Sequence, residues 1–169
     1  MSPFNAAVND AMRMLAAHGA TFVGQSVRYD GAAIYHSLDG VPMAQRVEMP
    51  VIENFQLGYC TGLAIAGRFP VCIYPRMDFM LLAMDQLVNH LDKLPRYGWR
   101  TKMIIRTTVG QKRPLDAGPQ HTQNHTAAFR LMLDSVRVEE VGTPFDVKDA
   151  YRRALAHTGA TLIVENPCA

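Results

Sequence analysis

The sequence has few cysteines, no long apolar run and little net charge. Its three cysteines, Cys60, Cys72 and Cys168, lack a paired spacing, so we expect reduced thiols and no disulfide framework. No apolar window reaches the roughly 18 residues of a membrane-spanning helix, and no basic segment followed by an apolar run opens the chain. We therefore expect a cytoplasmic protein without a membrane partner.

The sequence also lacks a large excess of charge of either sign. Lysine and arginine number 17 against 15 acids, scattered along the chain, which argues against a nucleic-acid partner. The 169 residues are 49% hydrophobic and 19% charged, enough for one domain with a sizeable core. We expect a single domain over residues 1–169, without repeats or linkers.

Apolar segments of helical and strand character alternate along the chain. A short extended segment is also expected to end at Pro50, because the residue before a proline avoids helical geometry. The alternation predicts an α/β fold, a three-layer parallel sheet with helices on both faces. The expected helices cover residues 3–18, 51–67, 80–94, 127–132 and 144–156, and the expected strands cover 21–24, 70–74, 103–107, 136–138 and 161–164.

One acid, Glu53, stands at the start of the helix that follows Pro50, with apolar residues on either side. The residue either faces water as an ordinary first-turn acid or has a function, because an unpaired buried carboxylate costs several kcal/mol. Gly58, Gly62 and Gly67 remove side chains from this helix, which predicts close approach of another helix or backbone.

Four further segments bear on the fold and function. The helix over 80–94 is too apolar all round to face water, so either a second chain or the rest of its own domain covers it. The loop over 109–120 is long enough to be functional or disordered. His121 and His125 share the spacing of two metal ligands, but no third ligand is apparent, so we predict no metal site. The segment Gly24-Gln25-Ser26 is a poor phosphate-binding loop, which disfavours a flavodoxin-like nucleotide binder.

Five stretches follow one another along essentially the whole chain: G-Q-S-V-R-Y-D-G, R-V-E-M-P-V-I-E-N-F-Q-L-G-Y-C-T-G-L-A-I-A-G, M-D-F-M-L-L-A-M-D-Q, V-G-Q-K-R-P-L-D-A-G-P-Q-H-T-Q and L-I-V-E-N-P. In this order they resemble the pyrimidine-binding domain of thiamine diphosphate-dependent enzymes, as in the β subunit of pyruvate and branched-chain 2-oxoacid dehydrogenases. The resemblance implies the thiamine diphosphate-binding fold in its pyrimidine-type form.

The resemblance assigns roles to three residues. Glu53 matches the glutamate that hydrogen-bonds a ring nitrogen of the cofactor's aminopyrimidine and favours its imino form. Phe79 matches the aromatic residue on which that ring stacks, although the pattern alone favours a core residue. His121 matches a histidine at the substrate end of the cofactor, where an imidazole suits proton transfer. Gln25 stands where the family usually has an acid, so it is either a loop residue or marks the loss of a proton relay.

The resemblance also implies a partner. The family binds the diphosphate and Mg²⁺ through a Gly-Asp-Gly and asparagine motif that this sequence lacks, so an α-like chain is expected to hold both, in a heterotetramer. The further domain of the β subunit is missing as well, which favours a smaller enzyme acting on a 2-oxo acid or a ketose: a decarboxylase, a carboligase or a transketolase-like enzyme. The alternative is a non-catalytic regulatory or binding module that retains the fold and the dimer surface.

Overall fold

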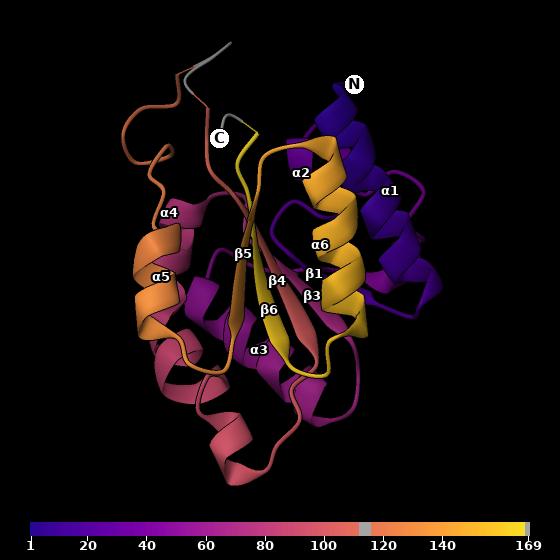
Figure 1. Cartoon of the computed structure of the whole chain (residues 1–169). Helices are drawn as coiled ribbons and strands as arrows, with labels where there is room; N and C mark the ends of the chain where they lie inside the picture. The colour runs from indigo at the N-terminus through magenta and orange to yellow at the C-terminus, as the bar shows by residue number, and fades with distance from the viewer. Residues whose placement is uncertain (112–115, 168–169) are drawn as a thin grey trace.

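The computed structural model describes residues 1–111 and 116–167 (Figure 1). Cys168 and positions 112–115 of the long loop lie outside these described residues. Within the described ranges no helix is long and apolar enough to cross a membrane. The elements in chain order are α1 (Pro3–Ala17), β1 (Thr21–Gly24), α2 (Ala33–His36), η1 (Met43–Gln45), β2 (Arg46–Glu48), α3 (Glu53–Ile65), β3 (Pro70–Ile73), α4 (Met77–Met80), η2 (Leu81–Ala83), η3 (Asp85–Leu91), η4 (Leu94–Tyr97), β4 (Met103–Thr108), α5 (Thr126–Met132), β5 (Arg137–Val141), α6 (Pro144–Ala156) and β6 (Ala160–Glu165).

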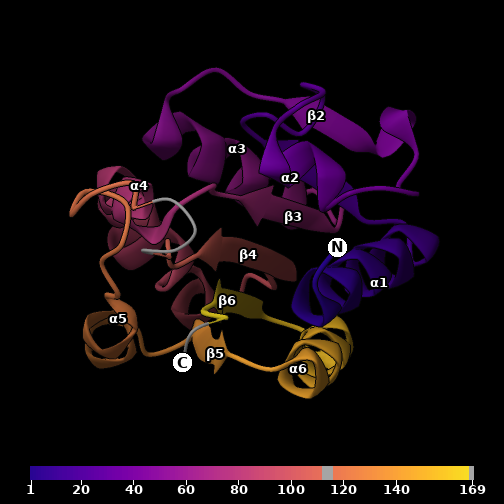
Figure 2. The same ribbon diagram turned by 90° about the horizontal axis from the view of Figure 1, so that it is seen from above.

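The strands of the described residues form one six-stranded sheet in the order β2-β1-β3-β4-β6-β5, with every neighbouring pair parallel. One apolar core lies between the sheet and α1, α2 and α6, and a second lies between the sheet and α3, α4, η3 and α5. Figure 2 shows these two sets of helices on opposite sides of the strands. Because parallel strands require crossovers that place helices on the sheet faces, the predicted three-layer α/β fold is confirmed.

Local sequence signals account for α1 and α6, which pack side by side on one face (Figures 1 and 2). Ser2 caps α1, its side chain accepting a hydrogen bond from the Asn5 N–H at 3.2 Å. Thr143 and Asp146 cap α6 reciprocally, each side chain bonding the other's backbone N–H. Such caps satisfy N–H groups that a helix leaves unpaired, so both helices begin close to the positions that the sequence predicts.

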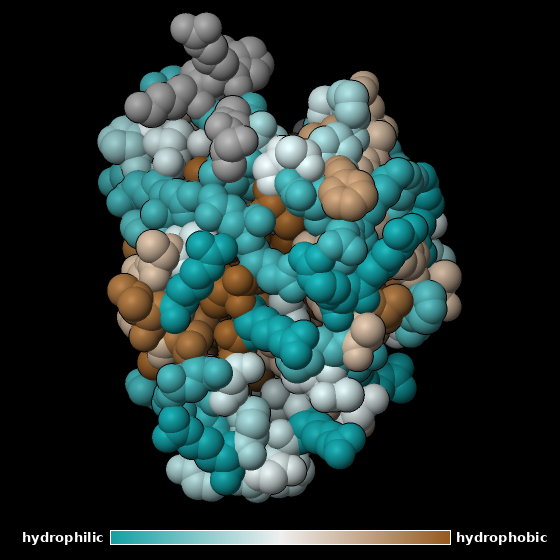
Figure 3. All heavy atoms as spheres, viewed as in Figure 1, coloured by the Kyte–Doolittle hydropathy of each residue, from teal (hydrophilic) through white to brown (hydrophobic). Residues whose placement is uncertain are grey.

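The edge strand β5 is protected by charged side chains. Arg137 is exposed, and Glu139 and Glu140 are partly exposed. Charges on an edge strand discourage pairing with another chain. Figure 3 shows hydrophilic side chains along this edge, beside an apolar patch at α5, where Leu131 and Met132 are exposed.

The prediction of a single regular helix over residues 80–94 is wrong in the type of helix. The segment is a series of short turns: the end of α4, the 3-10 turn η2, the π-helical η3 and the start of η4. Met80, Ala83, Leu87 and Leu91 are buried, at spacings of three and four residues. That spacing does not separate an α-helix from its tighter and wider variants, which is why periodicity predicted the helix but not its type.

The three glycines of α3 and its C-terminus have different environments. A Cβ on Gly58 would lie 3.3 Å from the Gln86 Oε1 of η3, so the predicted close approach occurs there. A Cβ on Gly62 would meet nothing within 4 Å, and Gly67 has a φ of +75° just after the helix. Gly67 therefore ends the helix, while Gly62 leaves a gap on its exposed surface.

Asp92 is a buried carboxylate that joins η3 to the start of β5. Its Oδ1 accepts the backbone N–H groups of Asp134, Ser135 and Val136 at 3.0, 2.7 and 3.0 Å, and its Oδ2 lies 2.8 Å from Lys93 Nζ. Burial raises the pKa of Asp92, but Lys93 and the three N–H groups outweigh it, so the pKa lies below its ordinary value.

Asp92→Asn is expected to lower the free energy of unfolding at neutral pH by about 1–3 kcal/mol, because an amide accepts these hydrogen bonds less strongly. A depressed folded-state pKa stabilises the protein above the unfolded value of about 3.9, and this stability is lost as pH falls through the folded value. The stability gap between wild type and variant should therefore shrink on acidification, as measured by urea unfolding. A gap of equal size at neutral and acidic pH would contradict this account. The exposed change Asp149→Asn serves as control.

Candidate functional site

Glu53 is the first residue of α3, at the edge where β1 and β3 end. It is only 6% exposed, so the interpretation as a water-facing first-turn acid is wrong. The Gln25 side-chain amide donates a hydrogen bond to Glu53 Oε1 at 3.2 Å. Within the described ranges, Oε2 accepts no hydrogen bond and no cationic group pairs with the carboxylate. One oxygen of this buried acid is therefore available to a ligand.

A clamp on the loop after β1 positions Gln25. The Glu48 carboxylate, at the end of β2, accepts the backbone N–H groups of Ser26 at 2.5 Å and Arg28 at 2.7 Å. Ser26 has a φ of 61°, a left-handed conformation that is uncommon for a non-glycine residue. The clamp directs Gln25 toward Glu53. An amide there gives Glu53 a hydrogen bond, whereas a second carboxylate would repel it.

The first turns of α3 are fixed to β3 by buried polar contacts. The Gln56 amide donates to the Ile73 carbonyl at 2.9 Å, and the Tyr74 hydroxyl donates to the Glu53 carbonyl at 2.8 Å. The thiols of Cys60 and Cys72 are also buried, and the Gln56 amide donates to Cys72 Sγ at 3.4 Å. Because both ends of these contacts are buried, the helix start that carries Glu53 is held in one position against the sheet.

Phe79 and His121 are brought together, although 42 positions separate them in the sequence. Their ring centroids lie 5.4 Å apart with planes at 86°, an edge-to-face arrangement. A Cβ on Gly110 would lie 1.9 Å from the His121 carbonyl oxygen, so only glycine fits there. Gln123 also donates to Asp78 at 2.9 Å, which ties the segment after the long loop to α4.

His121 and His125 do not belong to a group of three or more His, Cys, Asp and Glu side chains that could hold a metal ion among the described residues. His121 Nδ1 and His125 Nε2 are buried atoms without a hydrogen-bond partner within the same ranges. His121 therefore keeps a ring nitrogen that is not engaged by the chain's own described residues.

Glu53 and the Phe79–His121 pair occupy the same edge of the sheet without touching. Tyr74 connects them along the chain, since it bonds the Glu53 backbone and lies five residues before Phe79. Crevices outside the carboxyl ends of parallel strands are where open α/β sheets bind ligands. At this edge Glu53 supplies a buried acid with an oxygen that accepts no hydrogen bond within the described ranges, and Phe79 supplies a half-buried aromatic ring.

Comparison with known proteins finds relatives among the β subunits of pyruvate dehydrogenase. The chain is 27% identical over 124 residues to the β subunit of the pyruvate dehydrogenase E1 component of Gracilaria tenuistipitata var. liui, covering 71% of this chain and 37% of that protein. The corresponding subunit of Porphyra purpurea is also 27% identical, over 71% of this chain and 36% of its own length. The chain is homologous to these β subunits. It spans little more than a third of their length.

Other comparisons support the fold. The chloroplastic β-3 subunit of Arabidopsis thaliana is 25% identical over 123 residues, 71% of this chain and 30% of its own. The solved structure of a split-gene transketolase, an inactive β4 tetramer, matches with a TM-score of 0.71 and 14% identity, over 95% of this chain and 49% of that one. No family model matches the chain. The structural similarity to the split-gene transketolase confirms a transketolase-like α/β fold.

Proposed function

We propose that the chain is the β-like subunit of a split thiamine diphosphate-dependent enzyme, with residues 1–169 forming one pyrimidine-binding domain of a cytoplasmic protein. The observation that carries this proposal is the buried Glu53 carboxylate at the start of α3, whose Oε2 accepts no hydrogen bond within the described ranges. Homology to pyruvate dehydrogenase E1 β subunits supports the cofactor class. The reaction is decarboxylation of a 2-oxo acid with carboligation, or a transketolase-like cleavage of a ketose.

Three residues of the chain have separate roles in this proposed reaction. Glu53 holds a hydrogen bond to a ring nitrogen of the aminopyrimidine and shares a proton with it, in a site from which water is largely excluded. Phe79 supports the ring by stacking. Thiamine diphosphate, when bound, supplies the nucleophilic carbon that attacks the substrate's keto group. His121 holds or moves a proton at the substrate end through a ring nitrogen.

A partner chain completes this site. Phe55 and Tyr59 of α3 and its N-cap residue Ile52 recur at helical spacing and are 54%, 39% and 53% exposed. Leu82 is 66% exposed and belongs to η2, which contacts α3. These four residues, the α3 surface, lie next to Glu53 and the gap at Gly62. Exposed apolar patches of this kind mark protein interfaces. We assign the α3 surface to assembly with an α-like chain that holds Mg²⁺ and the diphosphate, in a heterotetramer.

Recovery of the partner tests the proposal. Affinity purification of the tagged chain from its native cells is expected to recover a second chain carrying Gly-Asp-Gly followed by an asparagine. The two chains together, with thiamine diphosphate and Mg²⁺, should consume a 2-oxo acid or a ketose, and neither chain alone should. Omission of Mg²⁺ serves as control. Absence of turnover from the reconstituted pair would reject the enzyme.

One observation favours a second candidate, a non-catalytic module with the same fold. The partner of Glu53 is the amide of Gln25 and not an acid, so a carboxylate relay between paired sites cannot run through position 25. In such a module Glu53 would bind a ligand without turning it over. The Glu53 variant described in the Discussion separates the two candidates.

A further inference from the structure

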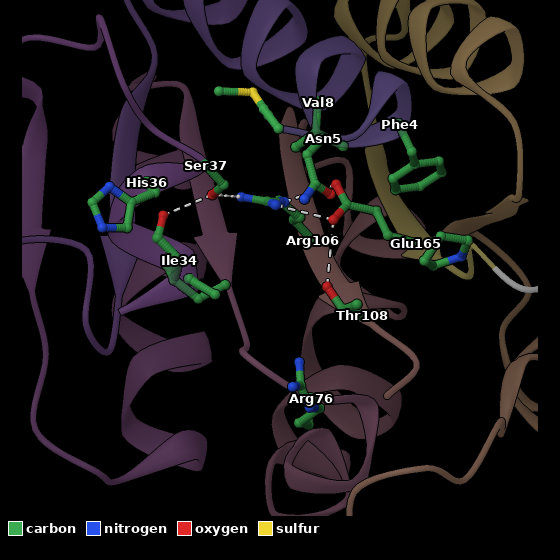
Figure 4. Close-up of a pocket in the computed structure, with 13 residues that line it drawn as sticks. Phe4, Asn5, Val8, Ile34, His36, Ser37, Arg76, Arg106, Thr108 and Glu165 are labelled. Atoms are coloured by element: carbon green, nitrogen blue, oxygen red, sulfur yellow. Dashed lines mark hydrogen bonds and ion pairs between the residues drawn. The ribbon is translucent and has the colours of Figure 1, made fainter. Parts of the chain in front are cut away.

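A second pocket lies apart from Glu53, Phe79 and His121. It has a volume of about 220 Å³ and is enclosed by α1, α2 and the carboxyl ends of β4 and β6 (Figure 4). Pockets for drug-sized ligands are usually about 300 Å³ or larger, so this one suits a molecule of few heavy atoms. The edge of the sheet on which it lies is the one where α/β proteins bind ligands.

The floor of the pocket is a buried ion pair that has further hydrogen-bond partners. Arg106 of β4 binds Glu165 of β6 through two contacts, Nε to Oε1 at 2.8 Å and Nη2 to Oε2 at 3.0 Å. The Tyr151 hydroxyl donates to Glu165 Oε1 at 2.8 Å, and Arg106 Nη1 donates to Ser37 Oγ at 2.7 Å. Thr108 Oγ1 lies 3.3 Å from Glu165 Oε2. The Arg106–Glu165 pair therefore contributes no net charge to this floor.

Arg76 supplies an uncompensated positive charge. Figure 4 shows it across the pocket from Val8, on the far side of Arg106 and Thr108. Its guanidinium donates to the Pro75 carbonyl at 2.9 Å and, within residues 1–111 and 116–167, forms no salt bridge. Arg76 and Arg106 against Glu165 leave a net charge of +1 on these three lining residues.

The walls are apolar. Phe4 and Val8 of α1, Ile34 of α2 and Pro167 line the space between the floor and the mouth, and the first three are less than 9% exposed. Apolar walls with few placed polar groups are typical of small-molecule sites. They suit a hydrocarbon tail and would leave the oxygens of an inorganic dianion without partners.

We propose that this pocket binds a small monocarboxylate, with its carboxylate on Arg76 and its short apolar tail between α1 and α2. An Arg–carboxylate contact pairs two donors with two acceptors in matching geometry. One negative charge balances the net charge of Arg76, Arg106 and Glu165. The proposal concerns a second site and holds whether or not the chain takes part in thiamine diphosphate chemistry.

Arg76 also lies close to the backbone beside His121. A Cβ on Gly110 would lie 3.3 Å from Arg76 Nε and 1.9 Å from the His121 carbonyl oxygen.

Calorimetric titration of the purified chain with butyrate, without any cofactor, tests the proposal. Saturable binding at one site is expected, and Arg76→Gln should weaken it at least tenfold. Arg68→Gln, an exposed arginine just after α3, is the matched control and should leave the affinity unchanged. Equal thermal unfolding temperatures of the three proteins would show that the fold is intact.

Three outcomes would overturn the proposal: no saturable butyrate binding, equal affinity in Arg76→Gln, or tighter binding of inorganic phosphate than of butyrate at the same site. Amide chemical shifts locate the ligand, and the largest changes are expected at Ile34 and Thr108. Changes confined to the surroundings of Glu53 would place butyrate in the other site and reject this one. Because no turnover is measured, failure of the enzyme proposal would not alter these results.

Discussion

Glu53→Gln is expected to lower kcat of the assembled, cofactor-loaded protein by roughly 10²–10⁴-fold, the usual contribution of a general acid–base group. The glutamine would fill the same space next to Gln25, but it cannot share a proton with a ring nitrogen. Steady-state turnover of the reconstituted two-chain protein measures the effect. Asp149→Asn, a change of an exposed acid on α6, should leave kcat as it is.

The fold of the variant is expected to survive. A buried neutral amide costs less than a buried charge, and the loss of a negative charge at a helix N-terminus costs only about 0.3–1 kcal/mol. If the Glu53→Gln protein assembles with its partner and retains full turnover, Glu53 is no proton-sharing group. If wild type and variant both bind the cofactor and neither turns over substrate, the module is the correct candidate.

Glu165→Ala should be the most destabilising single change outside the apolar core, at about 3–5 kcal/mol, the usual cost of breaking a buried ion pair. Arg106 is 3% exposed and would keep its charge with only Ser37 Oγ as an acceptor. Burial lowers the pKa of Arg106, and in the wild-type protein the nearby Glu165 charge helps to outweigh this effect. Glu165→Ala removes that compensation and leaves the cost of burying the guanidinium. Urea unfolding at neutral pH measures the loss.

Two controls make this result specific to burial. Glu139→Ala breaks the Arg153–Glu139 pair, whose arginine is half exposed, and should cost only about 0–1 kcal/mol. The double change Arg106→Met with Glu165→Leu removes both charges and should be less destabilising than Glu165→Ala alone. Equal losses for the buried and exposed pairs would show that burial does not set the strength of the Arg106–Glu165 contact.

Sequence patterns predicted most of the fold because its elements are encoded locally. β1, β3, β4 and β6 are short apolar runs that turn residues or proline delimit, and α1 and α6 carry side-chain caps. Their alternation determines the parallel sheet through the crossover rule. The π-helical η3 was missed because apolar spacing does not report the hydrogen-bonding pattern of the turns.

The surroundings of the candidate site were less predictable. The resemblance predicts Glu53, Phe79 and His121 as site residues, and only the folded chain shows that the rings of Phe79 and His121 lie close together. Glu48 was missed as the clamp on the Gln25 loop, since it lies 22 positions from Ser26 and looks like an ordinary strand-end acid. Arg106 and Glu165 are 59 positions apart, and nothing in either strand alone indicates that they pair. Long-range polar contacts of this kind leave no periodic signal.

The two buried cysteines beneath α3 can be used to detect opening of the structure around this helix. Cys60 lies on α3 and Cys72 on β3, and both are fully shielded from water. Burial and the contact with Cys72 raise the pKa of Cys60 well above its usual value, so this thiol stays protonated and poorly nucleophilic in the folded chain. An alkylating reagent can reach either sulfur only after the core around α3 and β3 opens. The rate at which Cys60 and Cys72 are labelled would therefore report how often the packing beneath the helix that carries Glu53 is lost.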